Sequence, residues 1–441
     1  MSSDHFMELR PTGGVSRRQF MIFSAAVAGV PLVAAVPPGV AFSAGAAEPG
    51  EEEQAYQQAV EAALASDPRV RRHLEPGREF GYRPRQILAA NADAQRVAAK
   101  LREYGLPAQL GNRFAGVTKL VFATEVDVPS IIRRLRDPKQ WPTSPVPAVQ
   151  PHHLTMGFGN IMGNPGTPPR VAAPLPAPDP TRLGEGAGVT VGICDTGIWR
   201  DAGALHPLWL GGSYVPETDD EDPVYVHSDQ LAVQGGHGTF VAGVVRQAAP
   251  GVRFDPEQAL NRFGVGDEEM LVNALGRLGQ AVTVVNLSLG CFTQDDLPSL
   301  PIANAVAALP DRVVVVAAAG NAGTSRPTWP AALADVLSVG AVRLAGTGIE
   351  PDPQSSFGPW VAACAFGDRV STYVPGQLAL TGLPVRVFHG FAGWSGTSFA
   401  TAHVSGRLAA MMTAGNLDAE QARLALLATP RWHPDYGVLV G

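Results

Sequence analysis

Four uninterrupted apolar runs in the second half of the chain constrain its fold more than any other feature. They are Val189–Asp195, Ala281–Leu289, Val313–Ala319 and Val336–Val342. Strands buried on both faces of a parallel sheet have this character, because helices cover both faces. Segments that fit helices lie between the runs, at Thr239–Gln247, Glu268–Leu278 and Ile302–Leu309. The alternation predicts an α/β domain over residues 189–441, with a doubly wound, mostly parallel sheet flanked by helices.

The composition excludes several classes of protein. Gly and Pro number 49 and 39 of 441 residues, and hydrophobic residues make up 45%. A disordered chain would lack this apolar content, and a coiled coil would be poor in Gly. The net charge of −7 argues against a nucleic-acid partner, since nucleic-acid-binding proteins carry basic patches.

The N-terminus has the features of an export signal. An apolar run from Phe20 to Val36 follows Arg17-Arg18, and small residues around Ala44–Ala46 come next. The paired arginines resemble a twin-arginine signal. We therefore expect residues 1–46 to direct export out of a bacterial cell and to be removed, with membrane contact only during export. A membrane anchor is the alternative, but a run of about 17 residues that contains Pro31 is short for a span.

Residues 47–155 are predicted to form a smaller module. Residues 47–75 fit a short helix or a tail, and the remainder fits strands and helices in the order β-α-β-β-α-β, which is typical of a ferredoxin-like α+β module. The elements identified are strands at Gln86–Ala90, Val117–Val126 and near 147–155, and helices at Ala92–Tyr104 and Val128–Arg136. Residues 156–188 are rich in Gly and Pro, so we expect a linker that a protease can reach.

Four residues at the ends of predicted elements have the chemistry needed for nucleophilic catalysis. Asp195 ends a strand and His237 lies in a glycine turn before a helix, while Asn321 follows a strand and Ser398 starts a helix. A serine attacks when a base removes its proton, and histidine suits that role. A buried carboxylate fixes the imidazole tautomer, and amide N–H groups stabilise an oxyanion.

The motifs around these residues resemble those of the subtilisin-like (S8, subtilase) serine proteases. The motifs are Asp-Thr-Gly-Ile from Asp195, His-Gly-Thr-Phe-Val-Ala-Gly from His237, and Gly-Thr-Ser-Phe-Ala-Thr-Ala around Ser398. The order Asp, His, Ser is also that of subtilisin. The resemblance implies a serine endopeptidase in which Asp195 orients His237, His237 is the base and Ser398 is the nucleophile. It implies that Asn321 donates to the oxyanion.

The same resemblance assigns substrate-binding segments and a regulator. It implies that Ser288, Leu289 and Gly290 form an edge strand that pairs with an extended peptide. Ala318, Ala319 and Gly320 are expected to line the pocket for the side chain before the scissile bond. The module at 47–155 resembles an inhibitory prosegment by its element order. The expected partners are thus a polypeptide substrate and this module, on a monomeric enzyme.

Two other functions stay open at this stage. One is a catalytically silent, peptide-binding protein on the same fold, because fold alone does not fix function. The other is a dedicated processing protease with a narrow substrate, like the mycosins of secretion systems. The first predicts peptide binding without an acyl-enzyme. For the second, the mycosins carry a C-terminal membrane helix, whereas residues 436–441 here are expected to be soluble.

No cofactor is required by this chemistry, and no metal site is predicted. The acidic run Asp219–Asp222 lacks the spaced ligands of a calcium loop, so we expect a solvated loop and leave a structural calcium ion open. His152 and His153 fit a strand end better than a metal site. Among the three cysteines, Cys194 is expected to be a core thiol, while Cys291 and Cys364 are either free or paired.

Overall fold

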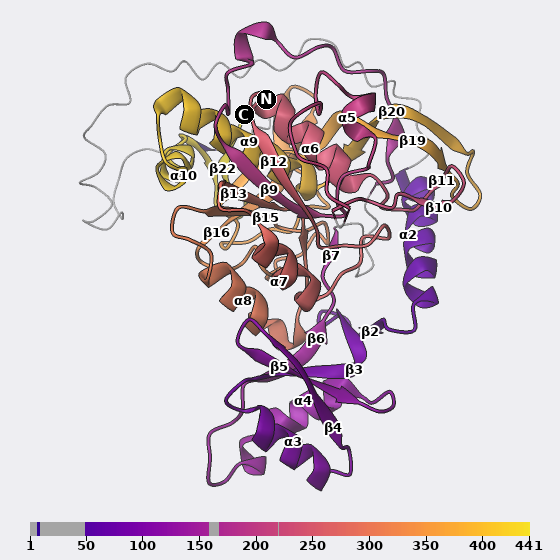
Figure 1. The fold of residues 1–441 in the computed structure, drawn as a ribbon, viewed down its shortest axis with the longest axis vertical. Coiled ribbons are helices and arrows are strands. Elements are labelled where there is room, and N and C mark those ends of the chain that lie inside the picture. Colours follow the sequence, from indigo (N-terminus) through magenta and orange to yellow (C-terminus); the bar gives the residue numbers. More distant parts are fainter. Residues whose placement is uncertain (1–6, 9–48, 158–166, 219) are drawn as a thin grey trace.

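The computed structural model describes residues 7–8, 49–157, 167–218 and 220–441. Figure 1 shows a larger body, above, and a narrower module, below, formed by residues before 157. The predicted export signal lies outside the described residues apart from Met7–Glu8, which form β1. Within the part of the chain described, no helix combines the length and apolar character needed to cross a membrane.

A mainly parallel sheet forms the centre of the larger body. Its order is β1-β21-β22-β18-β16-β15-β13-β9-β12, with β17 paired to β16. All neighbours from β22 to β12 are parallel. The bounds are β9 Thr190–Asp195, β12 Arg253–Gln258, β13 Val282–Leu287, β15 Val314–Ala318, β16 Val336–Ala345, β17 Gly348–Pro351, β18 Ala363–Phe366, β21 Arg431–His433 and β22 Gly437–Leu439. The predicted doubly wound sheet is confirmed.

Helices cover both faces of this sheet, which explains the continuous apolar runs. Val284 and Val314 belong to one buried cluster, and Val285 and Val315 belong to another, because alternate residues of a strand point to opposite faces. The first cluster includes helices α6 (His237–Ala248), α9 (Thr397–Gly415) and α10 (Ala419–Leu427). The second includes α7 (Glu268–Arg277) and α8 (Leu300–Ala307).

A second sheet and the expected linker pack beside this core. The sheet has the order β10-β11-β19-β20-β8. Its bounds are β8 Arg170–Val171, β10 Tyr225–His227, β11 Gln230–Leu231, β19 Asp368–Leu378 and β20 Arg386–Ser395, and α5 (Ala202–Leu205) lies nearby in the chain. In the predicted linker the structure describes residues 156–157 and 167–188, and these contain β7 (Met156–Gly157), β8 and a 3₁₀ turn at Pro180–Arg182.

The smaller module has the predicted ferredoxin-like order. Its antiparallel sheet runs β2-β3-β5-β4, and β6 pairs with β3. The elements are β2 Arg71–His73, β3 Phe80–Ala90, α3 Ala94–Glu103, β4 Ala108–Phe114, β5 Val117–Phe122, α4 Val128–Arg136 and β6 Val149–His153. Asp127 caps α4, accepting a hydrogen bond from the N–H of Ser130 at 3.2 Å. Ile87, Leu101 and Ile132 are fully buried between the sheet and its helices.

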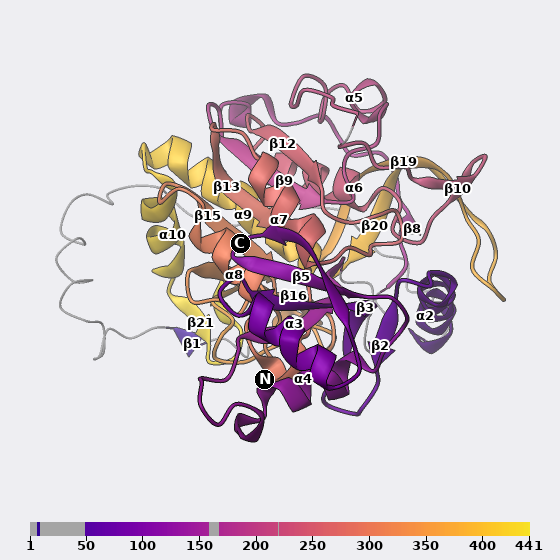
Figure 2. The ribbon, with the colours of Figure 1, turned by 60° about the horizontal axis from the view of Figure 1, so that its bottom comes forward.

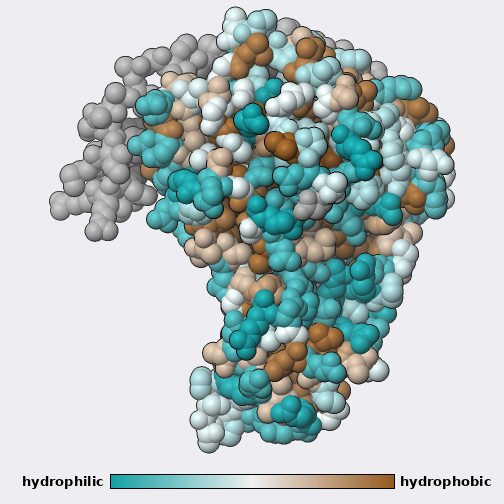
Figure 3. All heavy atoms as spheres, in the orientation of Figure 1, coloured by the Kyte–Doolittle hydropathy of each residue, from teal (hydrophilic) through white to brown (hydrophobic). Residues whose placement is uncertain are grey.

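A separate N-terminal helix, α2 (Pro49–Ser66), precedes this sheet. Figure 2 shows it beside the larger body, away from α3 and α4. Glu53 accepts a hydrogen bond from Gln354 at 2.9 Å, and Glu52 forms an ion pair with Arg386 at 2.7 Å. On the face drawn in Figure 3 the module is a narrower extension of the larger body, and apolar residues are scattered over both.

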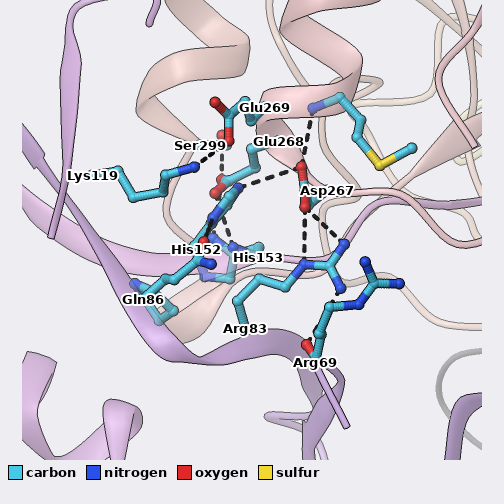
Figure 4. Close-up of polar contacts among 12 residues, drawn as sticks. Arg69, Arg83, Gln86, Lys119, His152, His153, Asp267, Glu268, Glu269 and Ser299 are labelled. Atoms are coloured by element: carbon cyan, nitrogen blue, oxygen red, sulfur yellow. Dashed lines mark hydrogen bonds and ion pairs between the residues drawn. The ribbon is translucent and has the colours of Figure 1, made fainter. Parts of the chain in front are cut away.

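A buried polar cluster joins the module to the start of α7 (Figure 4). Glu268 is fully buried and accepts hydrogen bonds from Gln150, Ser299 and the Nδ1 of His153. The N–H of Gln294 donates to His153 Nε2 at 3.1 Å, so both ring nitrogens of His153 have partners. Strand β6 ends at His153, which confirms the strand-end interpretation of the two histidines.

Next to it, Arg83 pairs with Asp267 at 2.7 Å. Burial would raise the pKa of Asp267, but the His152 side chain and the Arg83 guanidinium hold that pKa well below its usual range. Because both charged groups are buried, removing one partner leaves the other uncompensated. The module is thus fixed to the larger body by polar contacts that depend on one another.

Candidate active site

The structure brings Asp195 and His237 into direct contact. The Nδ1 of His237 lies 2.7 Å from Oδ1 of Asp195, and the N–H of Thr196 donates to the same oxygen at 2.7 Å. Asp195 is fully buried. The contact places the imidazole proton on Nδ1 and leaves Nε2 to act as a base. The ring of His237 also packs edge-on against Trp394, with centroids 5.3 Å apart.

Glycine at position 238 makes this contact possible. Asp195 is the last residue of β9, and His237 is the first of α6. A Cβ on Gly238 would lie 2.1 Å from the carbonyl oxygen of Gly197. Only glycine therefore allows the first turn of α6 to lie against the turn that follows Asp195.

Ser398 lies in the first turn of α9, beside the edge strand. Its hydroxyl donates to the carbonyl of Ser288 at 3.3 Å, and the Ser288 hydroxyl donates to the carbonyl of Ser398 at 2.9 Å. Among the described residues, the Ser398 hydroxyl makes no hydrogen bond to His237. Catalytic hydrogen bonds are often formed only in the substrate complex, so this arrangement is compatible with a nucleophile.

Asn321 is held with its amide toward the same space. Its Oδ1 accepts from the N–H and the hydroxyl of Thr397, each at 2.9 Å, so its Nδ2 faces the other way. A Cβ on Gly396 would lie 2.9 Å from that Nδ2. Asn321, His237 and Ser398 line one cavity of about 10 Å³, so the predicted oxyanion donor lies with the predicted nucleophile and base.

The predicted edge strand pairs with the chain itself. Strand β14 (Leu289–Gly290) is antiparallel to β7, with Leu289 opposite Gly157 and Gly290 opposite Met156. On its other side, β7 is held by the N–H of Gly157, which donates to Gly264 at 2.9 Å. Met156 and Gly157 therefore pair with Leu289 and Gly290 as an added antiparallel strand would.

The second predicted wall is also close to the site. Ala318 ends β15, and Ala319 and Gly320 follow it, all three buried. The N–H of Gly320 donates to the hydroxyl of Thr397, the residue before Ser398, at 3.1 Å. Because the side chains of these residues are small or absent, backbone atoms form most of this wall.

Tyr56 of α2 is a site residue that sequence reasoning missed. It lines the same cavity as His237 and Ser398 and is fully buried. Its hydroxyl donates to the carbonyl of Val233 at 2.8 Å and accepts from Gln234 Nε2 at 2.6 Å. Ser398 is 2% exposed and His237 3%. The cavity has room for about one water molecule, so the site is closed in this conformation.

The acidic run contains a second missed residue. We expected a solvated loop at 219–222. Residue 219 lies outside the described residues, but Asp222 is fully buried and Asp220 is 6% exposed. Oδ2 of Asp222 accepts hydrogen bonds from the Thr196 hydroxyl and the Gly236 N–H, so the side chain has internal partners. That part of the sequence prediction is wrong, because an acidic run alone does not reveal internal partners.

Metal ligands and thiols are two further kinds of side chain that bear on the chemistry of the site. No cluster of three or more His, Cys, Asp or Glu suited to a metal ion occurs among the described residues. Cys194, Cys291 and Cys364 are all buried free thiols, so Cys291 and Cys364 are not paired here. Burial raises the pKa of each thiol, which makes them poor nucleophiles.

Comparisons with known proteins identify the family of this chain. The model of the subtilase family (Peptidase_S8) matches residues 186–435. An intracellular serine protease of Paenibacillus polymyxa is 29% identical over 57% of this chain and 75% of its own length. Thermitase of Thermoactinomyces vulgaris is 29% identical over 57% and 84%. Mycosin-4 of Mycobacterium tuberculosis is 31% identical over 58% of this chain and 62% of its own.

A solved structure shares the fold. Fervidolysin from Fervidobacterium pennivorans, a keratinolytic enzyme related to subtilisin, superposes with a TM-score of 0.58 at 20% identity, over 86% of this chain and 64% of that one. At this identity the likeness concerns the fold alone. The family model covers more than half of the chain, including Asp195, His237 and Ser398. The chain therefore belongs to the subtilase family of subtilisin-like serine proteases.

Proposed function

We propose that this serine endopeptidase hydrolyses peptide bonds through an acyl-enzyme on Ser398. His237 takes the Ser398 proton as the hydroxyl attacks the scissile carbonyl, then gives it to the leaving amine. Water, deprotonated by the same imidazole, releases the acyl group. Asp195 holds the imidazole and stabilises its charged form. The observation that carries the proposal is the 2.7 Å contact of Asp195 with His237 in the cavity that Ser398 lines.

Two N–H donors are proposed to stabilise the tetrahedral intermediate. One is Nδ2 of Asn321, and the other is the backbone N–H of Ser398 in the first turn of α9. The helix dipole adds positive potential at this position. Ser288, Leu289 and Gly290 are proposed to bind the substrate backbone on the acyl side of the scissile bond, facing Ala318, Ala319 and Gly320.

Labelling with a fluorophosphonate tests the nucleophile and the base. Ser398→Ala and His237→Ala should abolish labelling, because the probe reacts only with an activated serine. Matched controls are Ser213→Ala, a buried serine whose hydroxyl donates to Leu210, and His389→Ala, an exposed histidine. Labelling that persists in either site variant would contradict the assignment. Failure of the wild type to label under all conditions would favour the silent peptide-binding alternative.

We further propose that residues 47–155 act as an inhibitory prosegment. Two contacts support this proposal: β7, which follows them, lies on β14, and Tyr56 of α2 lines the cavity of His237 and Ser398. Maturation would require a cut after Gly157 and before Val189. N-terminal sequencing of the wild type and of Ser398→Ala tests this. A mature chain that starts near residue 47 would make the module a permanent domain.

Export, a monomeric state and independence from cofactors are proposed with the enzyme. Changing Arg17-Arg18 to Lys-Lys should retain the protein in the cell if a twin-arginine signal is used. Light scattering tests the monomer, and chelator treatment tests whether a structural calcium ion contributes. The likeness to Mycosin-4 keeps a dedicated processing role as the second candidate. Cleavage of one sequence in a peptide library, with unrelated sequences untouched, would favour it.

A further inference from the structure

We propose that Asp222 is a positioning residue for His237 and acts through the peptide groups on both sides of it. The inference rests on the proposed function of His237 as the base, and it adds a residue outside the triad. Asp222 precedes His237 by 15 positions and belongs to none of the subtilase motifs in this sequence. It touches neither the imidazole of His237 nor Ser398 in any hydrogen bond of the described residues, so its action is indirect.

One oxygen of Asp222 is the centre of a short network. Its Oδ2 accepts the hydroxyl of Thr196 at 2.6 Å and the N–H of Gly236 at 2.8 Å. The Thr196 hydroxyl in turn accepts the N–H of Gly238 at 3.1 Å. The two peptide N–H groups that flank the N–H of His237 in sequence therefore both end on this network. Thr196 also donates its own N–H to Oδ1 of Asp195 at 2.7 Å.

The start of helix α6 explains why a remote side chain is needed here. The first N–H groups of a helix have no partner within the helix, and a Ser, Thr, Asp or Asn at the N-cap normally accepts one of them. In α6 the N-cap is Gly236, with φ of 84°, and it has no side chain to do so. Asp222 and Thr196 supply the missing acceptors from the loop and from the turn after β9.

The same contacts couple the base to its orienting acid. Thr196 is bonded to Asp195 by its N–H and to Gly238 by its hydroxyl, while Asp222 holds Thr196 and Gly236. A shift of this network would move the first turn of α6 relative to Asp195. Since misplacement by about 1 Å costs about a hundredfold in rate, such a shift matters for catalysis.

The protonation state of Asp222 determines which substitution preserves the network. Burial raises the pKa of Asp222 to about 8. The hydrogen bonds from Thr196 and Gly236 and the charge of Arg262 lower this pKa, and the charge of Asp195 raises it further, but burial is the largest cause. Near pH 7 the group is mainly a neutral acid. Asparagine resembles that acid in shape and keeps one oxygen acceptor, whereas alanine keeps none.

The experiment compares three variants expressed as the full chain and normalised by active-site titration. Asp222→Ala should lower kcat about 10- to 100-fold with KM within twofold, because the substrate-binding strand is untouched. Asp222→Asn should restore kcat to within about fivefold of wild type. Thr196→Val keeps the side-chain shape but removes the acceptor of Gly238, so kcat should also fall. Ser213→Ala is the matched buried control and should leave kcat unchanged.

A double variant provides the decisive comparison. Because Asp222 and Thr196 act through one network, Asp222→Ala with Thr196→Val should lose no more than about twofold beyond the larger single loss. Independent multiplication of the two losses would overturn the inference. A normal kcat per titrated site in Asp222→Ala would also overturn it, even if the amount of folded enzyme is reduced. If Asp222→Ala does not fold, a normal kcat in Thr196→Val would overturn the inference instead. Absence of activity in the wild type would instead overturn the proposed function.

Discussion

The contact of Tyr56 with the catalytic cavity makes a quantitative prediction about inhibition. In Tyr56→Phe the ring stays, but Val233 loses a donor and Gln234 loses an acceptor, both formed at 2.8 Å or less. Each such hydrogen bond contributes about 0.5–1.5 kcal/mol, so the closed conformation should lose about 1–3 kcal/mol. That corresponds to about a 5- to 150-fold increase in the open population. Tyr56→Ala also loses the buried ring, worth about 3–5 kcal/mol, and should open the site further.

The assay is the rate of fluorophosphonate labelling on the uncleaved, full-length band. When the open state is rare, the rate is proportional to its population, so Tyr56→Phe should label about 5- to 150-fold faster than wild type. Tyr104→Phe is the matched control, because Tyr104 donates a similar bond to Gln140 inside the module. An unchanged rate in both Tyr56 variants would refute the reasoning, as it would show that α2 does not limit access.

Alkaline pH gives an independent check on the same contact. Burial raises the pKa of the Tyr56 phenol above its usual value. The closed state therefore holds a proton that the open state releases above about pH 10, so labelling of wild type should accelerate through that pH. Tyr56→Phe should lack this acceleration. Equal pH dependence in the two chains would mean that Tyr56 ionisation is not linked to opening.

Three further predictions concern the oxyanion site, the module and stability. Asn321→Ala should lower kcat about 10²–10³-fold, the range known for loss of one such donor in subtilisin; a loss under tenfold, measured by peptide hydrolysis, would argue against Asn321 as the donor. In a Ser398→Ala background, Glu268→Ala should destabilise docking of the module by about 3–5 kcal/mol, because Gln150, Ser299 and His153 lose a buried partner. Glu269→Ala, which removes a more exposed ion pair with Lys119, should cost at most about 1 kcal/mol. Equal protease sensitivity of the module in the two variants would contradict this prediction. Burial raises the pKa of Asp222 to about 8 and that of Glu257 to about 7, so each of these two carboxyls binds more protons in the folded than in the unfolded state, whereas burial lowers the pKa of His206 and His403 and acts in the opposite sense. The Asp222 contribution should be lost as pH rises from about 4 to 8, so the free energy of unfolding, from denaturant midpoints, should decline relative to Asp222→Asn over that range; a pH-independent difference between the two chains would contradict this.

The parallel core was predictable because its strands carry their own signal. The run Val313–Ala319 contains only apolar residues, and it corresponds to β15 at Val314–Ala318. Strand β12, Arg253–Gln258, was missed because it lies at the sheet edge and contains Arg, Asp, Pro and Glu. The sequence of an edge strand reflects solvent on one side, so it resembles a loop.

The residues of the proposed triad could be identified from the sequence for a different reason. Asp195, His237 and Ser398 each lie in a glycine-containing motif whose backbone requirements restrict the neighbouring residues. Tyr56 and Asp222 have no such local signal. Tyr56 reaches the cavity from about 180 residues before His237, and Asp222 is recognisable only when Thr196 and Gly236 are adjacent in space. Long-range contacts of single side chains leave no pattern in one sequence.

The two separate attachments of the N-terminal region have a kinetic consequence. Helix α2 lies beside the cavity of His237 and Ser398, β6 and β7 dock through α7 and β14, and residues 67–70 connect α2 to β2, which pairs with β3. If the region is removed as proposed, such a tether would give each attachment a high effective concentration while the other is bound, and release would be slow even after the chain is cut beyond Gly157. A second cut within 67–70 would convert this bivalent ligand into two weak monovalent ones. Activation would then be autocatalytic, with a lag set by the first molecules to lose that tether.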